Sequence, residues 1–298
     1  MSEASHAVAA PTAAVIGASG FIGSALCRKL RSMGTRVVEV TVDRPALLAD
    51  ATLVPDLRDA STVYWAASRI NPLVAIEHPE LVTQDSVDFE AFLAAATRQM
   101  PGATVVLLSS GGTVYGSSPP PHSEDTIPRP ISAYGRAKLR LETMLQEASI
   151  RSVIARVSNA YGPGQSPAPG QGVIAHWLKA LDDEEPVTVF GDLSTVRDYV
   201  FIEDVTDLLA SAHLRPGVPG VLNVGSGMPT SLASVVDAIH SVVGNRRLEI
   251  DFEPKRPFDL TAAWLDVSLA ASSMGWKATT SLDEGIRRMW AWLHTRTQ

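Results

Sequence analysis

Tyr134 and Lys138 are the residues whose types and spacing most directly suggest chemistry. On a helix, positions four residues apart share one face, so the Lys138 ammonium can stand beside the Tyr134 phenol. A neighbouring cation favours the phenolate and lowers the pKa of a phenol from its ordinary value of about 10. We therefore expect Lys138 to make Tyr134 a usable base for a substrate hydroxyl near neutral pH.

Three glycines near the amino terminus indicate a dinucleotide site. The segment Gly17-Ala-Ser-Gly20-Phe-Ile-Gly23 follows an apolar run at 12–16 and opens a helical pattern at 21–33. In such a strand, turn and helix, the first glycine permits the tight turn and the second lets backbone approach a pyrophosphate. The third lets the helix pack on the strand. The predicted cofactor contacts in this turn are Gly17, Ser19, Gly20, Phe21, Ile22 and Gly23.

The residues after the second predicted strand, at 37–42, bear on the choice of dinucleotide. Asp43 would accept the adenosine ribose hydroxyls of NAD, whereas Arg44 would accommodate the additional phosphate of NADP. Both could equally be solvated loop charges. Asp56 and Leu57, after a further short strand, are predicted to flank the adenine, with an ordinary surface aspartate as the alternative for Asp56. We expect NAD, with NADP as the alternative. The positively charged nicotinamide would act together with Lys138 to lower the pKa of the Tyr134 phenol.

The order of the remaining apolar segments predicts an α/β fold with a Rossmann-type, doubly wound parallel sheet. Runs at 62–67 and 104–109 are typical of buried strands, and helical patterns separate the strands along the chain. Segment 116–130 is rich in proline and predicts a stiff loop. It leads into the Tyr134 helix, for which Ser132 is the expected N-cap and Leu141, Met144 and Leu145 the packing residues.

A second, smaller domain is predicted to be discontinuous in sequence. The irregular stretch 161–172 interrupts the sheet pattern, and a helix is expected around 173–181. A strand and helix at 198–213 and a strand at 221–225 then suggest a return to the sheet. We assign residues 12–158 and 199–224 to a dinucleotide-binding domain, 159–198 and 225–298 to a C-terminal substrate domain, and 1–11 to a flexible amino terminus.

Composition excludes several classes of function. The 298 residues hold 25 Lys and Arg against 32 Asp and Glu, a net charge of −7, which argues against binding nucleic acid through a basic surface. No apolar run predicts a membrane span, and residues 1–11 lack the order of a signal peptide, so we expect a cytoplasmic protein. The sole cysteine, Cys27, is expected to pack inside a helix. No metal site is predicted.

Taken together, these motifs resemble the extended short-chain dehydrogenase/reductases of the NAD-dependent epimerase/dehydratase family. The resemblance covers nearly everything after residue 12. Besides the glycine turn and Tyr134-x-x-x-Lys138, it rests on Ser109-Ser-Gly-Gly-Thr-Val-Tyr-Gly116, Asn159-Ala-Tyr-Gly-Pro163, Val196-Arg-Asp-Tyr-Val200, Arg256-Pro-Phe-Asp259 and Gly275-Trp276.

The resemblance implies roles for individual residues. Tyr134 would be the base, and Lys138 would also hold the nicotinamide ribose. Further cofactor contacts would come from Ala66, Ala67 and Ser109, and further substrate contacts from Gly111, Asn159, Val189, Phe190 and Asp259. Arg197 and Arg256 would clamp a diphosphate, and an acidic protein that binds a dianion does need fixed guanidinium groups. The alternatives are an ion pair between Arg197 and Asp198, and a core role for Val189 and Phe190.

One position departs from the family pattern. Relatives carry a serine or threonine that hydrogen-bonds the reacting hydroxyl, and the aligned residue here is Gly111. Thr113 and Ser110 are the candidates to replace that donor, unless both bond only local backbone. Gly112 and Thr113 also stand where the family's dehydratases carry acids, which disfavours elimination of water.

The function that the resemblance implies is a nucleotide-sugar 4-epimerase acting on a UDP-hexose or UDP-N-acetylhexosamine through a transient 4-keto sugar and enzyme-bound NAD. The alternatives are an NAD(P)H-dependent reductase of a 4-keto nucleotide sugar and a non-catalytic dinucleotide sensor. By the same resemblance, the helical stretches 87–98 and 133–147 are expected to pair in a homodimer.

Overall fold

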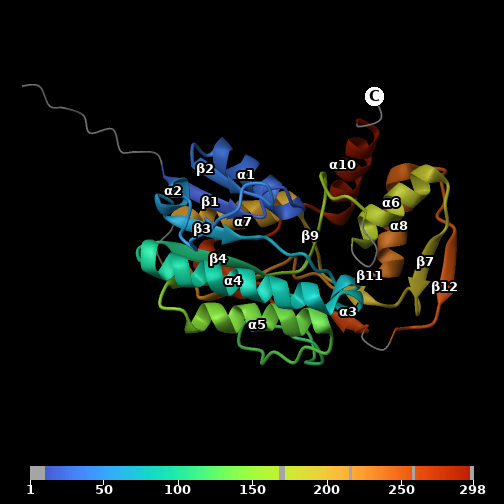
Figure 1. The fold of residues 1–298 in the computed structure, drawn as a ribbon. Helices are drawn as coiled ribbons and strands as arrows, with labels where there is room; N and C mark the ends of the chain where they lie inside the picture. Colours follow the sequence, from blue (N-terminus) through green and yellow to red (C-terminus); the bar gives the residue numbers. More distant parts are fainter. Residues whose placement is uncertain (1–10, 168–171, 215–216, 257–258, 296–298) are drawn as a thin grey trace, which may run out of the picture.

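A six-stranded parallel sheet forms the centre of the larger part of the molecule (Figure 1). The computed structural model describes residues 11–167, 172–214, 217–256 and 259–295. The sheet order is β2-β1-β3-β4-β5-β10, so the order reverses at β1 as a doubly wound fold requires. The strands are β1 (Thr12–Ile16), β2 (Arg36–Val40), β3 (Thr62–Trp65), β4 (Thr104–Ser110), β5 (Arg151–Val157) and β10 (Val221–Val224).

Helices cover both faces of this sheet, which is why most residues of its central strands β1, β3 and β4 are apolar and buried. Helices α1 (Phe21–Ser32) and α7 (Ile202–Leu214) pack on one face, where Leu26 and Leu208 are buried. Helices α4 (Pro79–Gln99) and α5 (Ala133–Glu147) cover the other face (Figure 1). There Phe89 and Phe92 pack 4.8 and 5.1 Å from the ring of Trp65. The Rossmann-type prediction is confirmed.

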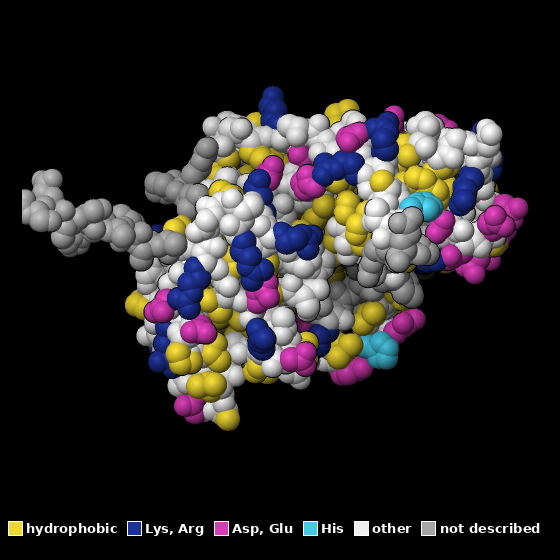
Figure 2. All heavy atoms as spheres, turned by 90° about the horizontal axis from the view of Figure 1, so that it is seen from above, with side chains coloured by type: hydrophobic (Ala, Val, Ile, Leu, Met, Phe, Trp, Pro, Cys, Tyr) yellow, Lys and Arg dark blue, Asp and Glu magenta, His cyan; other side chains and the backbone are white. Residues whose placement is uncertain are grey.

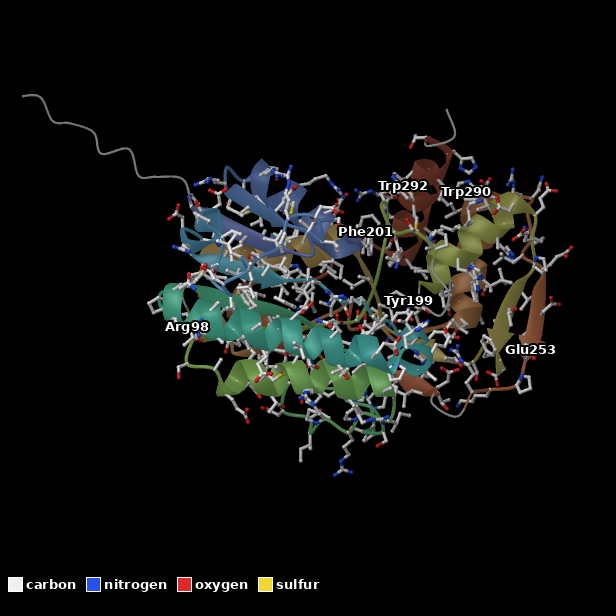
Figure 3. The ribbon with its side chains drawn as sticks, viewed as in Figure 1. Arg98, Tyr199, Phe201, Glu253, Trp290 and Trp292 are labelled. Atoms are coloured by element: carbon white, nitrogen blue, oxygen red, sulfur yellow. The ribbon has the colours of Figure 1, made fainter. Side chains whose placement is uncertain are left out.

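A smaller group of elements lies beside the carboxyl-terminal edge of the sheet. It has its own buried cluster, which contains Trp177, Leu178 and Ile239. Figure 3 labels Tyr199 and Phe201, on the strand that runs between this group and the sheet. The chain enters the group after β5, α7 packs again on α1, and β10 joins the six-stranded sheet. The domain boundaries stay a prediction. Its elements are α6 (Val173–Asp183), α8 (Leu232–Val243), α10 (Leu282–Thr295), β6 (Asn159–Tyr161), β7 (Val187–Phe190), β8 (Val196–Arg197), β9 (Tyr199–Phe201), β11 (Thr230–Ser231), β12 (Ile250–Glu253) and β13 (Ala262–Ala263).

The short strand expected before Asp56 does not form. Leu53 makes only an isolated bridge to Leu47, and Asp56 lies on the short helix α2 (Pro55–Arg58). The reason is local turn chemistry: the Asp50 carboxylate accepts hydrogen bonds from the backbone N–H and hydroxyl of Thr52, and Pro55 then starts a helix.

The proline-rich loop is irregular, as predicted, and it is attached to the edge strand β10. The Glu124 carboxylate accepts a hydrogen bond of 2.8 Å from the Asn223 N–H, and the Asn223 side chain donates to the His122 carbonyl at 2.8 Å. The loop thereby covers an edge that would otherwise present unpaired backbone groups. It ends at Ser132, whose hydroxyl accepts from the Gly135 N–H at 3.0 Å and caps α5 as expected.

Three sequence expectations concern the surface and the cysteine. Figure 2 shows Lys and Arg side chains interspersed with Asp and Glu on the displayed face. Within the described ranges, no helix has the length and apolar character needed to cross a membrane, and no cluster of His, Cys, Asp and Glu could hold a metal ion.

Cys27 is buried, and burial raises the pKa of its thiol to about 12, so it is the packed residue that the sequence predicted.

Candidate active site

A cavity of about 700 Å³ opens between the carboxyl ends of β4 and β5 and the smaller group of elements. This is the edge at which open parallel sheets bind their ligands. The cavity brings together most of the catalytic and substrate residues expected from sequence, although they come from separate parts of the chain. Those that line it are Ser110, Thr113, Tyr134, Asn159, Val189, Phe190, Arg197, Arg256 and Asp259.

The glycine turn is built for close backbone approach. The N–H groups of Gly17 and Ala18 donate to the Val40 carbonyl at 3.0 and 3.1 Å, which ties the turn to β2. A Cβ on Gly17, where φ is +89°, would lie 2.6 Å from the Ala67 nitrogen, and one on Gly23 would lie 2.1 Å from the Gly17 oxygen. Helix α1 starts directly afterwards with its N-cap, Gly20, carrying no side chain. Its unpaired N–H groups therefore suit the pyrophosphate of a dinucleotide.

The residues predicted to hold the adenosine lie outside the cavity, near the turn. Asp43 and Arg44 are both exposed. They lie in the turn that follows β2, which is closed by a backbone bridge between Thr41 and Arg44. Asp56 is exposed and lies 3.8 Å from Arg36. Leu57, by contrast, is fully buried in the core, so its side chain cannot flank an adenine; a contact there is limited to its backbone.

Tyr134 and Lys138 share a face of α5, as their spacing predicted, with the Lys138 Nζ 5.6 Å from the centre of the Tyr134 ring. Lys138 alone does not lower the pKa of the Tyr134 phenol, a shift that was expected from Lys138 and a positively charged nicotinamide together. Burial, and secondly the charge of Asp85, raise the pKa of the Tyr134 phenol to about 12. Burial also lowers the pKa of the Lys138 ammonium to about 8. The free energy that the phenolate loses on desolvation is larger than the electrostatic stabilisation that one lysine provides at this distance.

Arg197 and Arg256 also line the cavity. Arg256 forms a bidentate pair with Asp259, at 2.7 and 3.0 Å, and lies 4.4 Å above the ring of Phe190. Burial lowers the pKa of Arg197. The nearby charge of Asp259 acts to raise this pKa, and the charge of Arg256 acts to lower it. Two cations around one carboxylate leave a positive site suited to an anionic ligand.

The alternative of an ion pair between Arg197 and Asp198 is wrong. The Asp198 carboxylate instead accepts hydrogen bonds from the backbone of Ser226 and Gly227, at 2.8 and 3.1 Å, and from the Ser158 hydroxyl. The Asp198 carboxylate therefore links two loops beside the cavity, and Arg197 lines the cavity.

The remaining lining residues differ in what they offer a ligand. Phe190 is 40% exposed and presents its ring, whereas Val189 is buried and belongs mainly to the core. The Asn159 amide donates to the Asp198 carbonyl at 2.9 Å, which fixes its orientation. Gln165, which sequence analysis missed, lines the cavity and is only 6% exposed; its place directly after Gly162-Pro163-Gly164 was the available signal.

Comparison with known proteins agrees with this geometry. Residues 13–225 match the model of the NAD dependent epimerase/dehydratase family. The chain belongs to this family. It is therefore an NAD-dependent enzyme, and the glycine turn fits that cofactor.

Three individual members of the comparison are similar to this chain over different shares of its length. The UDP-glucose 4-epimerase of Mycolicibacterium smegmatis is 32% identical over 310 aligned positions, which cover 95% of this chain and 99% of the relative. The structure of Thermus thermophilus UDP-glucose 4-epimerase in complex with NAD superposes with a TM-score of 0.82 at 28% identity, covering 95% of this chain and 99% of that one. An Escherichia coli dTDP-4-dehydro-6-deoxyglucose reductase is 32% identical over 189 residues, but the match spans only 60% of the reductase and 62% of this chain.

Like Gln165, Asp85 is a residue near the site that sequence analysis missed. It lies on α4 and is only 7% exposed. Its carboxylate accepts hydrogen bonds from the Ser68 hydroxyl and from the backbone N–H of Arg69, each at 3.1 Å, and pairs with the Arg69 guanidinium. Its charge raises the pKa of both Tyr134 and Lys138. The available signal was an acid at helical spacing with Phe89 and Phe92, on the stripe that packs into the core.

We expect Asp85→Asn to move the whole pH–rate profile toward acid. Removing the negative charge lowers the pKa of Tyr134, so the limb that rises as the phenol ionises shifts to lower pH. It also lowers the pKa of Lys138, so the limb that falls as the ammonium deprotonates shifts the same way. The measurement is kcat/KM against pH. Asp88→Asn, which removes a charge that also pairs with Arg69, is the matched control. An unmoved or alkaline-shifted profile for Asp85→Asn would contradict the electrostatic role.

Gly111, in contrast to the other substrate residues predicted from sequence, does not line the cavity. The two candidate replacements do, and the Thr113 hydroxyl donates to the Ser110 oxygen at 2.9 Å. The alternative in which both hydroxyls bond only local backbone is therefore wrong. The neighbouring Ser109, predicted to contact the cofactor, lines the cavity and donates to the buried Glu142 carboxylate at 2.5 Å.

Proposed function

We propose that the protein is a nucleotide-sugar 4-epimerase, acting on a UDP-hexose or UDP-N-acetylhexosamine. The observation that carries the proposal is that Tyr134 and the two arginines line one cavity. A sugar can therefore reach the base while its diphosphate is held by Arg197 and Arg256. The names of the aligned relatives, which are UDP-glucose 4-epimerases in two of the three cases, support the same assignment.

The residues divide the work between holding and proton transfer. Arg197 and Arg256 bind the diphosphate, and the Phe190 ring covers the nucleobase. The Tyr134 oxygen takes the proton of the C4 hydroxyl and returns it after the sugar has turned to present its other face. Bound NAD supplies the acceptance and return of hydride at C4, and its cationic ring adds the positive charge that Lys138 alone does not provide. Because the clamp holds the diphosphate rather than the hexose, the ring is free to turn.

The cofactor residues follow from the same arrangement. We assign the pyrophosphate to the turn from Gly17 to Gly23, the nicotinamide ribose to Lys138 and the adenosine ribose to Asp43, with Ala66 and Ala67 beside the turn. Asp43 favours NAD. A protein that recycles its cofactor also has reason to retain it, and we expect NAD to co-purify.

Proton NMR tests the function directly. Purified protein is incubated with UDP-galactose and, separately, UDP-N-acetylgalactosamine, with no cofactor added, and the C4 epimers are followed. We expect conversion of at least one, because an epimerase regenerates its NAD in every cycle. Failure to convert any nucleotide sugar offered, by folded protein that contains NAD, would refute the proposal.

A reductase of a 4-keto nucleotide sugar is the second candidate, favoured by the Escherichia coli reductase match and by Arg44 next to Asp43. It uses the same base but consumes reduced cofactor. Stoichiometric formation of oxidised cofactor with a 4-keto sugar, without epimerisation, would assign this activity instead.

We also infer a cytoplasmic homodimer that pairs through α4 and α5. The two helices lie side by side on the outer face (Figure 1). Between them is a hollow lined by Leu93, Ala94 and Met144, and Val87 is 51% exposed on the same helix as Leu93. Light scattering should give twice the chain mass of 31.7 kDa. A monomeric mass at the concentrations used for assay would contradict this inference.

A further inference from the structure

Packing excludes a side chain at position 111. A Cβ on Gly111 would lie 2.7 Å from the Leu265 Cδ1 and 2.9 Å from the Arg156 carbonyl oxygen. Leu265 is itself buried, and its backbone N–H is held by Asp198 at 3.3 Å. The first atom belongs to a buried side chain and the second to the backbone, so neither can move away easily. A side chain at position 111 therefore cannot donate a hydrogen bond to the reacting hydroxyl, and another residue must do so.

Four hydroxyls line the cavity between the end of β4 and the start of the Tyr134 helix, and three of them have assigned tasks. Ser109 donates to Glu142 at 2.5 Å. Ser132 accepts from the Gly135 N–H at 3.0 Å and caps α5. Thr113 donates to Ser110 at 2.9 Å.

Ser110 differs from these three because its oxygen accepts a hydrogen bond while its own proton has no acceptor among the described residues. A hydroxyl can accept and donate at once. Donation by Thr113 occupies a lone pair of Ser110 and strengthens the bond that Ser110 can donate onward. The two hydrogen-bonded hydroxyls line the same cavity as Tyr134.

We infer that Ser110 is a catalytic residue that donates a hydrogen bond to the sugar C4 oxygen, and that Thr113 is a positioning residue acting through Ser110. The inference rests on the proposed function and extends it. No proton leaves Ser110: Tyr134 takes the proton from the C4 hydroxyl, and Ser110 stabilises the negative charge that develops on that oxygen.

A double-mutant cycle with Ser110→Ala and Thr113→Val tests both roles. Removing one such donor typically costs about 100-fold or more in kcat, so we expect that loss for Ser110→Ala with KM for the nucleotide sugar nearly unchanged. Thr113→Val should lower kcat by roughly 10-fold, the equivalent of one ordinary hydrogen bond. In the Ser110→Ala background it should cost nothing further, because Thr113 no longer has a partner to orient. Thr113→Ser keeps the hydroxyl and should restore activity.

Several results would overturn the inference. Near wild-type kcat for Ser110→Ala removes Ser110 from catalysis. An equal loss from Thr113→Val in both backgrounds means that Thr113 acts on the substrate independently. Binding of NAD and thermal unfolding are measured for each variant, and Ser272→Ala, which removes an exposed hydroxyl from α9 (Ser268–Met274), is the control for serine removal itself. Failure of the proposed function is distinguishable, because it would appear as an inactive wild-type protein before any variant is compared.

Discussion

Tyr134→Phe should lower kcat by roughly 100-fold or more, because the variant keeps the ring but loses the atom that accepts the substrate proton. Its nucleotide-sugar affinity should stay close to that of the wild type, since the proposed diphosphate ligands, Arg197 and Arg256, are unchanged in this variant. The measurement is initial-rate epimerisation by NMR together with calorimetric binding of the nucleotide sugar.

The matched control for this variant is Tyr64→Phe. Tyr64 is a fully buried tyrosine outside the cavity whose hydroxyl donates to the Leu209 carbonyl at 2.7 Å. Its loss should cost about 1 kcal/mol of stability and leave turnover unchanged. Full activity in Tyr134→Phe would exclude Tyr134 as the base, and equal losses in both variants would indicate a structural effect.

Gly23→Ala should weaken the binding of NAD without unfolding the protein. The added methyl would lie 2.1 Å from the Gly17 oxygen, so either the turn or helix α1 must move. Forced overpacking of this kind costs about 1–3 kcal/mol. If the strain falls on the turn that receives the pyrophosphate, affinity for NAD drops by roughly 10-fold to 100-fold.

Calorimetric titration of cofactor-stripped protein with NAD checks this expectation. Gly102→Ala is the control, because a Cβ at Gly102 has nothing within 4 Å and no positive φ to oppose it. Unchanged NAD affinity in Gly23→Ala would mean that the turn does not form the cofactor site. An unfolded Gly23→Ala variant would mean that the strain is spread through the sheet rather than confined to the turn.

Local features of the site could be predicted from sequence because backbone geometry alone relates the residues involved. The shared face of Tyr134 and Lys138 follows from helical spacing, and α5 runs over the predicted range because Ser132 caps it. Glycine spacing likewise determined the turn before α1. The alternation of apolar runs predicted the parallel sheet and the return of the chain at β10.

Other features depend on residues far apart in the chain, and only the tertiary structure decided them. The pKa of Tyr134 reflects burial and the charge of Asp85 more than the lysine one turn away. Asp198 turned out to bind the 226–227 loop, which left Arg197 facing the cavity.

Gly111 shows the division most clearly. Sequence analysis identified the missing donor, but the side chain of Leu265, brought beside it by the fold, excludes any replacement at that position. Sequence by itself indicated the fold class, the glycine turn and Tyr134 as the candidate base, since periodicity and spacing are local. Tertiary packing decided which charges are desolvated and which hydroxyls line the cavity, since burial and contact arise only when distant segments meet.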